Sequence, residues 1–192
     1  MMIIKLLLWE EIFITLNNKI ENMIKIKTPL TESIINNLTV GEMVLISGYI
    51  YTGRDAVLPR IVELIELGEF DDYNINLEGA VVFHSAVSVA GVGPTSSNKF
   101  DIESSIPVLS QAGVKLHLGK GELSKKTTIA LKTHNSVYAI TPPVTALLNS
   151  KTISSKLIAF PELGMEAFHL LEVKDYPVII AIAHGKSIYD DK

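Results

Sequence analysis

A lysine between two glycines is the first arrangement in the sequence that could bind an anion. Gly119-Lys120-Gly121 follows a β-rich segment and precedes a helical one, so flexible backbone and a cation lie near a helix N-terminus, which favours anions. This suits a carboxylate or a phosphate. It is not a P-loop, because the spacing from Gly113 is one residue too long and Gly121 replaces the hydroxyl residue that would hold magnesium. From the tripeptide alone, a glycine turn with an exposed lysine is the simpler interpretation.

Two further segments carry a cation at a position where a ligand could bind. Arg54 follows a β-rich run, and its planar guanidinium could hold a carboxylate through two parallel hydrogen bonds. The simpler alternative is a surface Arg54–Asp55 ion pair beside a helix that Asp55 caps. The segment 93–99 is rich in turn residues and hydroxyls and ends in Lys99, but a solvated turn has the same composition.

Several kinds of site are excluded or weakly supported. The chain has no cysteine, which excludes a disulfide, a thiol nucleophile and an iron–sulfur cluster bound by this chain. Its five histidines are far apart and lack metal-ligand spacing, and Gly-x-Ser-x-Gly is absent. Glu162 and Glu166 would share a helix face, but this spacing is common on solvated helices and does not identify an acid/base pair.

Composition indicates one globular domain. The 192 residues are 47% hydrophobic, enough for a sizeable core, and the net charge of −4 is scattered, which favours neither nucleic acid nor an anionic membrane as partner. The apolar segment 1–16 is interrupted by charges and lacks a cleavage site, and no apolar run is long enough to span a bilayer. We therefore expect a soluble cytoplasmic protein.

Strand-like and helix-like segments alternate from Met23 onward, which predicts a single α/β domain over residues 23–192. Residues 1–22 are interpreted as an N-terminal extension of uncertain status. Thr28 and Pro29 are expected to cap and begin the first helix. Strands are predicted at 43–51, 80–83, 114–118, 137–140, 153–160 and 178–183, and helices after residues 29 and 55, at 102–111 and 124–133, and near 147.

Four segments, taken in order, resemble the C-terminal domain, or separate β subunit, of class I fumarate hydratases, and the related tartrate dehydratase β subunits share the pattern. They are Ser47–Ala56, Gly93–Ser96, Gly119–Gly121 and Pro161–Ala167. The resemblance covers about residues 25–189, and the ordered combination is far more specific than any single motif.

This resemblance implies a swivelling β/β/α fold and the β subunit of a [4Fe–4S] hydro-lyase that reversibly hydrates fumarate to malate. A cysteine-bearing α subunit would hold the cluster, and this chain would bind no cofactor itself. Arg54 and Lys120 would bind the carboxylates of a small dicarboxylate, Lys99 and Ser96 would also contact substrate, and Thr95 would take part in proton transfer at carbon. The face that the partner covers could also support a homo-oligomer.

Departures from the family pattern keep two alternatives open. Leu58 and Pro59 stand where many members have His-Lys, Lys99 stands where an arginine is usual, and 141–143 replaces a glycine-rich stretch. Lysine keeps the charge but not the bidentate geometry of arginine. The alternatives are a dehydratase for tartrate or another hydroxy-dicarboxylate, and a diverged, non-catalytic paralogue that binds a partner or a small acid.

Overall fold

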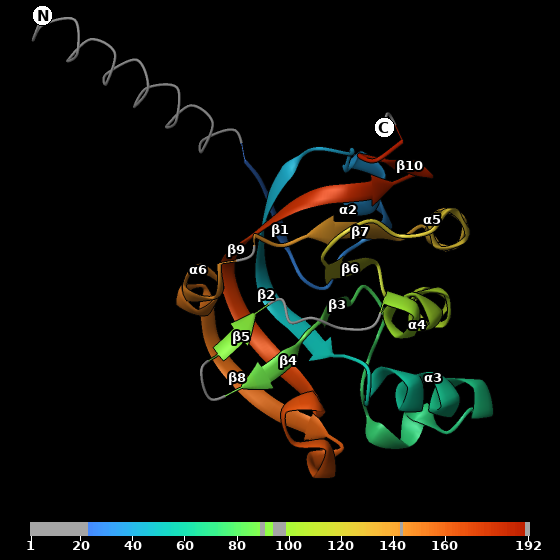
Figure 1. The fold of residues 1–192 in the computed structure, drawn as a ribbon, viewed down its shortest axis with the longest axis vertical. Coiled ribbons are helices and arrows are strands. Elements are labelled where there is room, and N and C mark those ends of the chain that lie inside the picture. Colours follow the sequence, from blue (N-terminus) through green and yellow to red (C-terminus); the bar gives the residue numbers. More distant parts are fainter. Residues whose placement is uncertain (1–22, 89–90, 94–98, 143, 191–192) are drawn as a thin grey trace, which may run out of the picture.

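The computed structural model describes residues 23–88, 91–93, 99–142 and 144–190, so the predicted extension 1–22 lies outside it (Figure 1). The strands are β1 (Ile24–Lys27), β2 (Met43–Gly53), β3 (Val81–His84), β4 (Ala86–Ser88), β5 (Gly91–Gly93), β6 (Leu116–Gly119), β7 (Val137–Ile140), β8 (Thr152–Ala159), β9 (Phe168–Ala183) and β10 (Lys186–Ser187). The α-helices are α2 (Glu32–Asn37), α3 (Leu58–Leu67), α4 (Lys99–Gln111), α5 (Lys125–Thr133) and α6 (Thr145–Ser150), and two 3₁₀ helices are η1 (Phe70–Tyr73) and η2 (Pro161–Glu166).

Five strands close into a ring. Strands β2, β3, β6 and β7 are parallel neighbours in that order. Strand β9 runs antiparallel to this set and pairs with β2 over most of its length and with β7 at its C-terminal end. Because β9 joins the first and last parallel strands, the ring β2–β3–β6–β7–β9 has no open edge between them.

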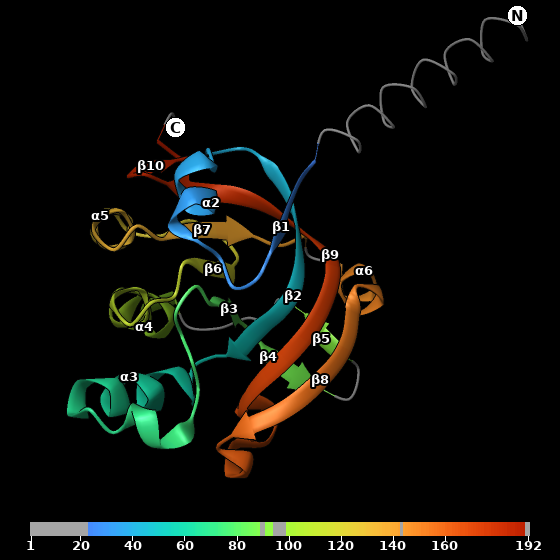
Figure 2. The same ribbon diagram turned by 180° about the vertical axis from the view of Figure 1, so that it is seen from behind.

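Side chains alternate between the inside of this ring and a layer of helices outside it. The inner positions of all five strands belong to one apolar core, which includes Ile46, Phe83, Leu118, Ala139 and Val178. The outer positions pack against helices: Val82 contacts the cluster that includes Leu58 of α3 and Leu109 of α4, and Tyr138 contacts the cluster that includes Leu131 of α5. Figures 1 and 2 show α3, α4 and α5 along one side of the sheet, and β8 with the first half of β9 on the other.

Helix α2 covers the end of the ring at which the parallel strands begin. Its Ile35 and the preceding Leu30 belong to the inner core, and the Leu30 N–H donates to the carbonyl of Gly79, just before β3. The predicted cap at Thr28 and Pro29 is wrong, because Thr31 caps this helix through its hydroxyl. Thr28 instead accepts a hydrogen bond from the Tyr49 N–H in β2, at 2.6 Å.

The alternation of strands and helices predicted from the sequence is confirmed, and so is a mixed α/β single domain. One large difference is β9, a single strand of 16 residues of which the sequence predicted only the apolar second half. Its first half alternates polar and apolar residues because one face packs on the core and the other does not. Among the described residues, no helix is both long enough and apolar enough to cross a membrane.

The first prediction concerns the irregular point of β2 at Gly48, where the register with β9 shifts and φ is +109°. A Cβ atom there would lie 2.5 Å from the hydroxyl oxygen of Thr28, which the Tyr49 N–H holds in place. Gly48→Ala should therefore combine the cost of a left-handed conformation, about 1–2 kcal/mol, with an overpacking cost of about 1–3 kcal/mol. The matched control Gly41→Ala, at φ +89° with open space around it, should show the first cost alone. Equal losses in denaturant unfolding would contradict this account.

Candidate functional site at the carboxyl ends of the parallel strands

Each of the four parallel strands of the ring is followed by one residue that lies beside the corresponding residue of the neighbouring strand. These residues are Arg54 after β2, Ser85 after β3, Lys120 after β6 and Thr141 after β7. The sheet ladder continues into this row, because the Ser85 N–H donates to the Gly53 carbonyl at 3.1 Å and the Thr141 N–H donates to the Gly119 carbonyl at 3.2 Å. We call these four residues the mouth row.

All four positions of the mouth row continue the inner face of the ring. Phe83, Leu118 and Ala139 point into the inner core, and Ser85, Lys120 and Thr141 follow them by two residues, which is the repeat of a strand. On β2 the same alternation runs from the core residue Ile50 to Arg54. Side chains that follow parallel strands at one edge are a common location for ligand sites in α/β proteins.

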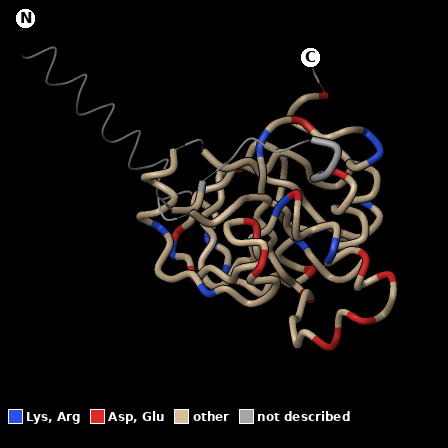
Figure 3. Tube along the Cα trace, turned by 60° about the horizontal axis from the view of Figure 1, so that its bottom comes forward, with Lys and Arg blue, Asp and Glu red and all other residues tan. Residues whose placement is uncertain are grey.

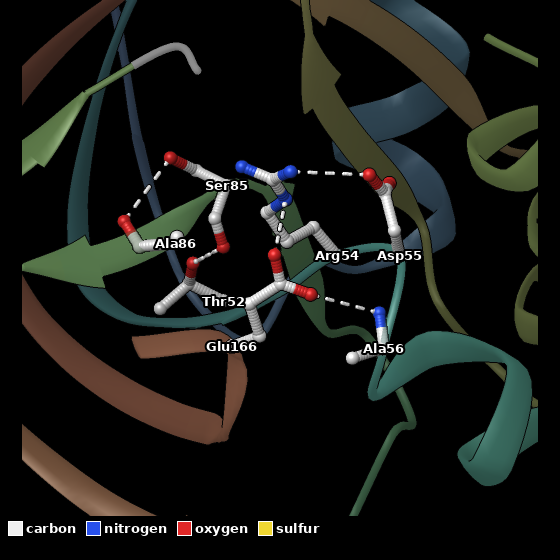
Figure 4. A network of polar contacts seen from close by, with 7 residues as sticks. All are labelled: Thr52, Arg54, Asp55, Ala56, Ser85, Ala86 and Glu166. Carbon is white, nitrogen blue, oxygen red and sulfur yellow. Dashed lines mark hydrogen bonds and ion pairs between the residues drawn. The ribbon is translucent and has the colours of Figure 1, made fainter. Parts of the chain in front are cut away.

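Arg54 is held by two acidic side chains (Figure 4). Its Nη2 lies 3.2 Å from Oδ2 of Asp55, and its Nε lies 3.2 Å from Oε1 of Glu166. Only 16% of the Arg54 side chain is exposed, so the guanidinium has a defined place. The predicted helix cap at Asp55 is wrong: Val57 occupies the N-cap of α3, and Asp55 binds Arg54 instead.

Glu166 fixes Arg54 from a part of the chain that is distant in sequence. Its second oxygen accepts a hydrogen bond from the Ala56 N–H at 3.1 Å, so one carboxylate joins η2 to both the side chain and the backbone that follow β2. Gly164 allows this approach, because its φ of 57° and ψ of −120° break η2 in a conformation that favours glycine. The predicted helix face shared by Glu162 and Glu166 is wrong, because the non-helical Gly164 lies between them; Glu162 binds Arg60.

Beside Arg54, the end of β3 is tied to β2. The Thr52 hydroxyl donates to the Ser85 carbonyl at 2.8 Å, and the Ser85 hydroxyl donates to the Ala86 carbonyl at 3.3 Å (Figure 4). Both side chains are fully buried. The backbone next to Arg54 is therefore fixed by side-chain hydrogen bonds as well as by the sheet.

Lys120 is exposed, and it makes no ion pair with any described residue. The helix N-terminus that follows it is already occupied: Glu103 of α4 accepts hydrogen bonds from the Ser124 N–H at 3.0 Å and from the Thr127 hydroxyl at 2.7 Å. The sequence correctly indicated a place suited to a carboxylate at the start of α5, but the protein supplies that carboxylate itself. Any external anion would thus be bound by Lys120 and not by the helix end.

Three predicted site residues have no described side chain. Thr95 and Ser96 lie outside the described residues. Lys99 is the first residue of α4, and only its backbone is described. The structure therefore brings Arg54 and Lys120 to one edge of the sheet, and the roles of all five residues stay predictions.

Buried polar atoms without partners gather near the mouth row. Buried side-chain atoms that make no hydrogen bond with any described residue are Oδ1 of Asp55, Nδ1 of His84, Oγ1 of Thr141 and the hydroxyl of Tyr176. Three of them lie within two residues of the end of a parallel strand. Since most buried polar groups in proteins are satisfied, such a cluster indicates a place where a ligand or a partner completes the bonding.

A buried histidine pair lies on the helix-facing side of the sheet, next to the mouth row. Nε2 of His84 is 3.2 Å from Nδ1 of His117, and Nε2 of His117 is 2.9 Å from the hydroxyl oxygen of Ser110 on α4. Burial lowers the pKa of His84 to about 4, and burial together with the neighbouring His84 lowers the pKa of His117 well below its usual value. Both rings are therefore neutral at physiological pH, and neither was singled out from the sequence.

Comparison with known proteins decides the family. A family model described as "Fumarase C-terminus" matches residues 8–192. The chain belongs to the fumarase C-terminus family. The predicted resemblance is thereby confirmed, and the match begins inside the segment interpreted as an extension.

The relatives within this family are hydro-lyases of two kinds. The chain is 29% identical to the anaerobic class I fumarate hydratase of Escherichia coli, in a match that covers 77% of this chain and 28% of that protein. It is 30% identical to fumarate hydratase 2 of Leishmania major, in a match that covers 77% of this chain and 27% of that protein. It is 27% identical to the L(+)-tartrate dehydratase subunit beta of Escherichia coli over 84% of both chains. The chain thus spans about a third or less of the fumarate hydratases that it matches.

This member of the fumarase C-terminus family cannot hold an iron–sulfur cluster through thiolates, because its sequence has no cysteine. Among the residues that the structure describes, no group of three or more histidine or acidic side chains could hold a metal ion either. The described residues of this chain therefore do not fit an iron–sulfur cluster of their own.

The second prediction compares two glutamates of η2 in this fumarase C-terminus domain. Glu166→Ala removes the acid that binds partly buried Arg54 and the Ala56 N–H, so we expect a loss of about 1–3 kcal/mol of unfolding free energy. The matched control Glu162→Ala removes an ion pair whose side chains are 48% and 57% exposed, and should cost less than about 1 kcal/mol. Chemical denaturation measures both. A larger loss for Glu162→Ala would contradict the role given to Glu166.

The third prediction concerns acid stability. Because the folded-state pKa of His84 is lowered from 6.5 to about 4, the unfolded chain binds more protons than the folded one as the pH falls below 6.5. Stability is therefore full above pH 6.5 and is lost toward pH 4, by roughly 3 kcal/mol for His84 alone. Unfolding measured from pH 7 to pH 4 should show a smaller decline in a His84→Asn/His117→Asn double variant. Parallel curves for the two proteins would refute this.

Proposed function

We propose that this chain is the β subunit of a hydro-lyase that reversibly adds water to fumarate to give malate, and that its own part is to bind and orient the dicarboxylate. The observation that carries the proposal is the mouth row, in which a member of the fumarase C-terminus family presents two cations, Arg54 and Lys120, on one edge and one face of a sheet. Two carboxylates of a small dianion are the natural ligands for two such cations. The swivelling β/β/α architecture and the assignment of residues 23–192 to one functional domain are part of this proposal.

The chemistry divides between this chain and a partner. Hydration breaks the π bond of the alkene and forms one C–O and one C–H bond, and its reverse removes a proton from carbon. By resemblance, Thr95 takes part in that proton transfer, while Ser96 and Lys99 contact substrate beside Arg54 and Lys120. Fixing the dianion increases the reaction rate because a bound and oriented substrate has already lost the translational and rotational freedom that it would otherwise lose on reacting.

The [4Fe–4S] cluster implied by the family would be supplied by a cysteine-bearing α subunit, where it would act as a Lewis acid on oxygen. The exposure of Lys120 in the mouth row is also consistent with a partner that covers it. Lys120 is exposed and makes no ion pair with any described residue, so its charge is available to a ligand or a partner.

The relatives support a second candidate substrate as well. The chain is 27% identical to a tartrate dehydratase β subunit and 29% identical to a fumarate hydratase, so both activities occur among proteins similar to it. A dehydratase for tartrate or another hydroxy-dicarboxylate would use the same two cations. Assays of the assembled pair with malate and with tartrate distinguish the candidates, and activity on neither would favour the non-catalytic paralogue.

The fourth prediction tests the two cations in the assembled pair. Lys120→Met and Arg54→Met should each remove a charge-assisted contact worth about 1.5–3 kcal/mol, which lowers kcat/KM roughly 10- to 150-fold. Lys120→Met should leave the melting temperature unchanged because Lys120 is exposed, whereas Arg54→Met should lower it because Glu166 loses its partner. Thr95→Val should lower kcat about a hundredfold with little change in KM.

The control for this prediction is Arg60→Met, which removes an exposed arginine that binds only exposed Glu162 among the acids of the described residues. It should leave kcat/KM near the wild-type value. Near-wild-type kinetics in the Arg54, Lys120 and Thr95 variants would reject the proposed site. Co-purification with a cysteine-bearing subunit under anaerobic conditions, followed by the hydration assay, tests the assembly itself.

A further inference from the structure

Thr141, like Ser85, is a member of the mouth row to which the family resemblance gives no role. It is the first residue after β7, and its N–H donates to the carbonyl of Gly119, so its backbone lies next to Lys120. It also follows Ala139 by two residues and so continues the inner face of the ring. By strand position and by face, Thr141 is equivalent to Arg54 and Lys120.

Among the described residues the hydroxyl of Thr141 has no hydrogen-bond partner, although only 6% of the residue is exposed. An unsatisfied buried hydroxyl costs about 1–3 kcal/mol, and valine would fill the same space without that cost. Other hydroxyls near the ends of the parallel strands make hydrogen bonds within the chain: the Thr52 hydroxyl donates to the Ser85 carbonyl, and the Ser85 hydroxyl donates to the Ala86 carbonyl. The position of Thr141 thus combines a stability cost with a place beside an exposed cation.

We propose that Thr141 is a ligand-binding residue that recognises the hydroxyl group of a hydroxy-dicarboxylate whose carboxylates are bound by Arg54 and Lys120. This inference rests on the proposed function and adds a preference for hydroxylated over unsubstituted dicarboxylates. A neutral hydroxyl both donates and accepts, so it matches another hydroxyl, whereas the two cations match the charged ends. A site that hydrogen-bonds a substrate hydroxyl discriminates strongly against the analogue that lacks it, because its own polar group is then left unpaired.

Tyr176 on β9 offers a matched control. Its hydroxyl is also buried and has no partner among the described residues. Its aromatic ring lies inside the ring of strands, 6.2 Å from that of Phe83 in an edge-to-face contact. It is fully inaccessible and belongs to the core. Thr141→Val and Tyr176→Phe therefore both delete an unpartnered hydroxyl while keeping the shape of the side chain, one in the mouth row and one in the core.

The test is calorimetric binding of L-malate, tartrate and succinate to the pair assembled with the α subunit, together with the melting temperature of each variant. Thr141→Val should raise or keep the melting temperature and weaken malate and tartrate binding about 2- to 12-fold, the usual value of one neutral hydrogen bond. Succinate, which has no hydroxyl, should bind as before. Tyr176→Phe should also raise or keep the melting temperature and should change none of the three affinities.

The outcomes separate this inference from the proposed function. Unchanged malate binding in Thr141→Val, or an equal loss for succinate, would overturn the assignment even if the pair hydrates fumarate. A pair that prefers malate to succinate through Thr141 but shows no turnover would uphold the assignment and reject the hydro-lyase. A fall in the melting temperature of Thr141→Val would show that the hydroxyl has a structural role and would overturn the assignment too.

Discussion

Strand β9 is hydrogen-bonded to β2 along most of its length and to β7 near its end, and this double pairing turns an open parallel sheet into a closed ring. An open sheet of four short strands would leave two edges and one uncovered face. With the ring closed, the inner positions of all five strands make one core. Helix α2 covers the end where the parallel strands begin, so the residues that follow these strands are fixed at the opposite end.

The position of Arg54 shows how this scaffold is used. The guanidinium lies between Asp55 and Glu166, so the free chain holds one cation with two acids. This arrangement orients the planar donor group, and it also lowers the local positive charge that an anionic ligand would meet. Lys120 has no such acid among the described residues, so the two cations differ in kind. Arg54 is suited to a fixed, directional contact, and Lys120 to a long, adaptable one.

The sequence predicted the local structure well because hydrophobic periodicity and turn residues act over short distances. The end of α3 at Gly68 and the start of α5 near Ser124 are examples, since a left-handed glycine and a serine cap are local signals. Ring closure was not predicted, because it depends on which strand β9 meets. The wrong expectations at Thr28 and Asp55 have the same origin: each residue has a side chain suited to capping, but a closer partner in the folded chain takes it.

The candidate site was predictable in part for a related reason. Arg54 and Lys120 are visible in the sequence because each is part of a short glycine-containing motif. Glu166 lies within Pro161–Ala167, one of the segments that carry the family resemblance, but its contact with Arg54 spans more than a hundred residues and has no local signal. Glu103 and the histidine pair lacked any motif and became apparent only from the packing of α4 on the sheet.

The distribution of charge bears on what could complete the mouth row. Lysines and arginines are dispersed over the described trace and form no single basic face (Figure 3). Long-range attraction of an anion is therefore weak, and recognition has to come from close contacts at a desolvated place. An ion pair between exposed Lys120 and a carboxylate contributes little binding free energy while both groups remain in water, but the same ion pair is stronger when water is excluded. A subunit that covers the mouth row would thus increase the affinity of the site without adding a cation, which gives a physical reason for a binding half and a cluster-bearing half to act only when joined.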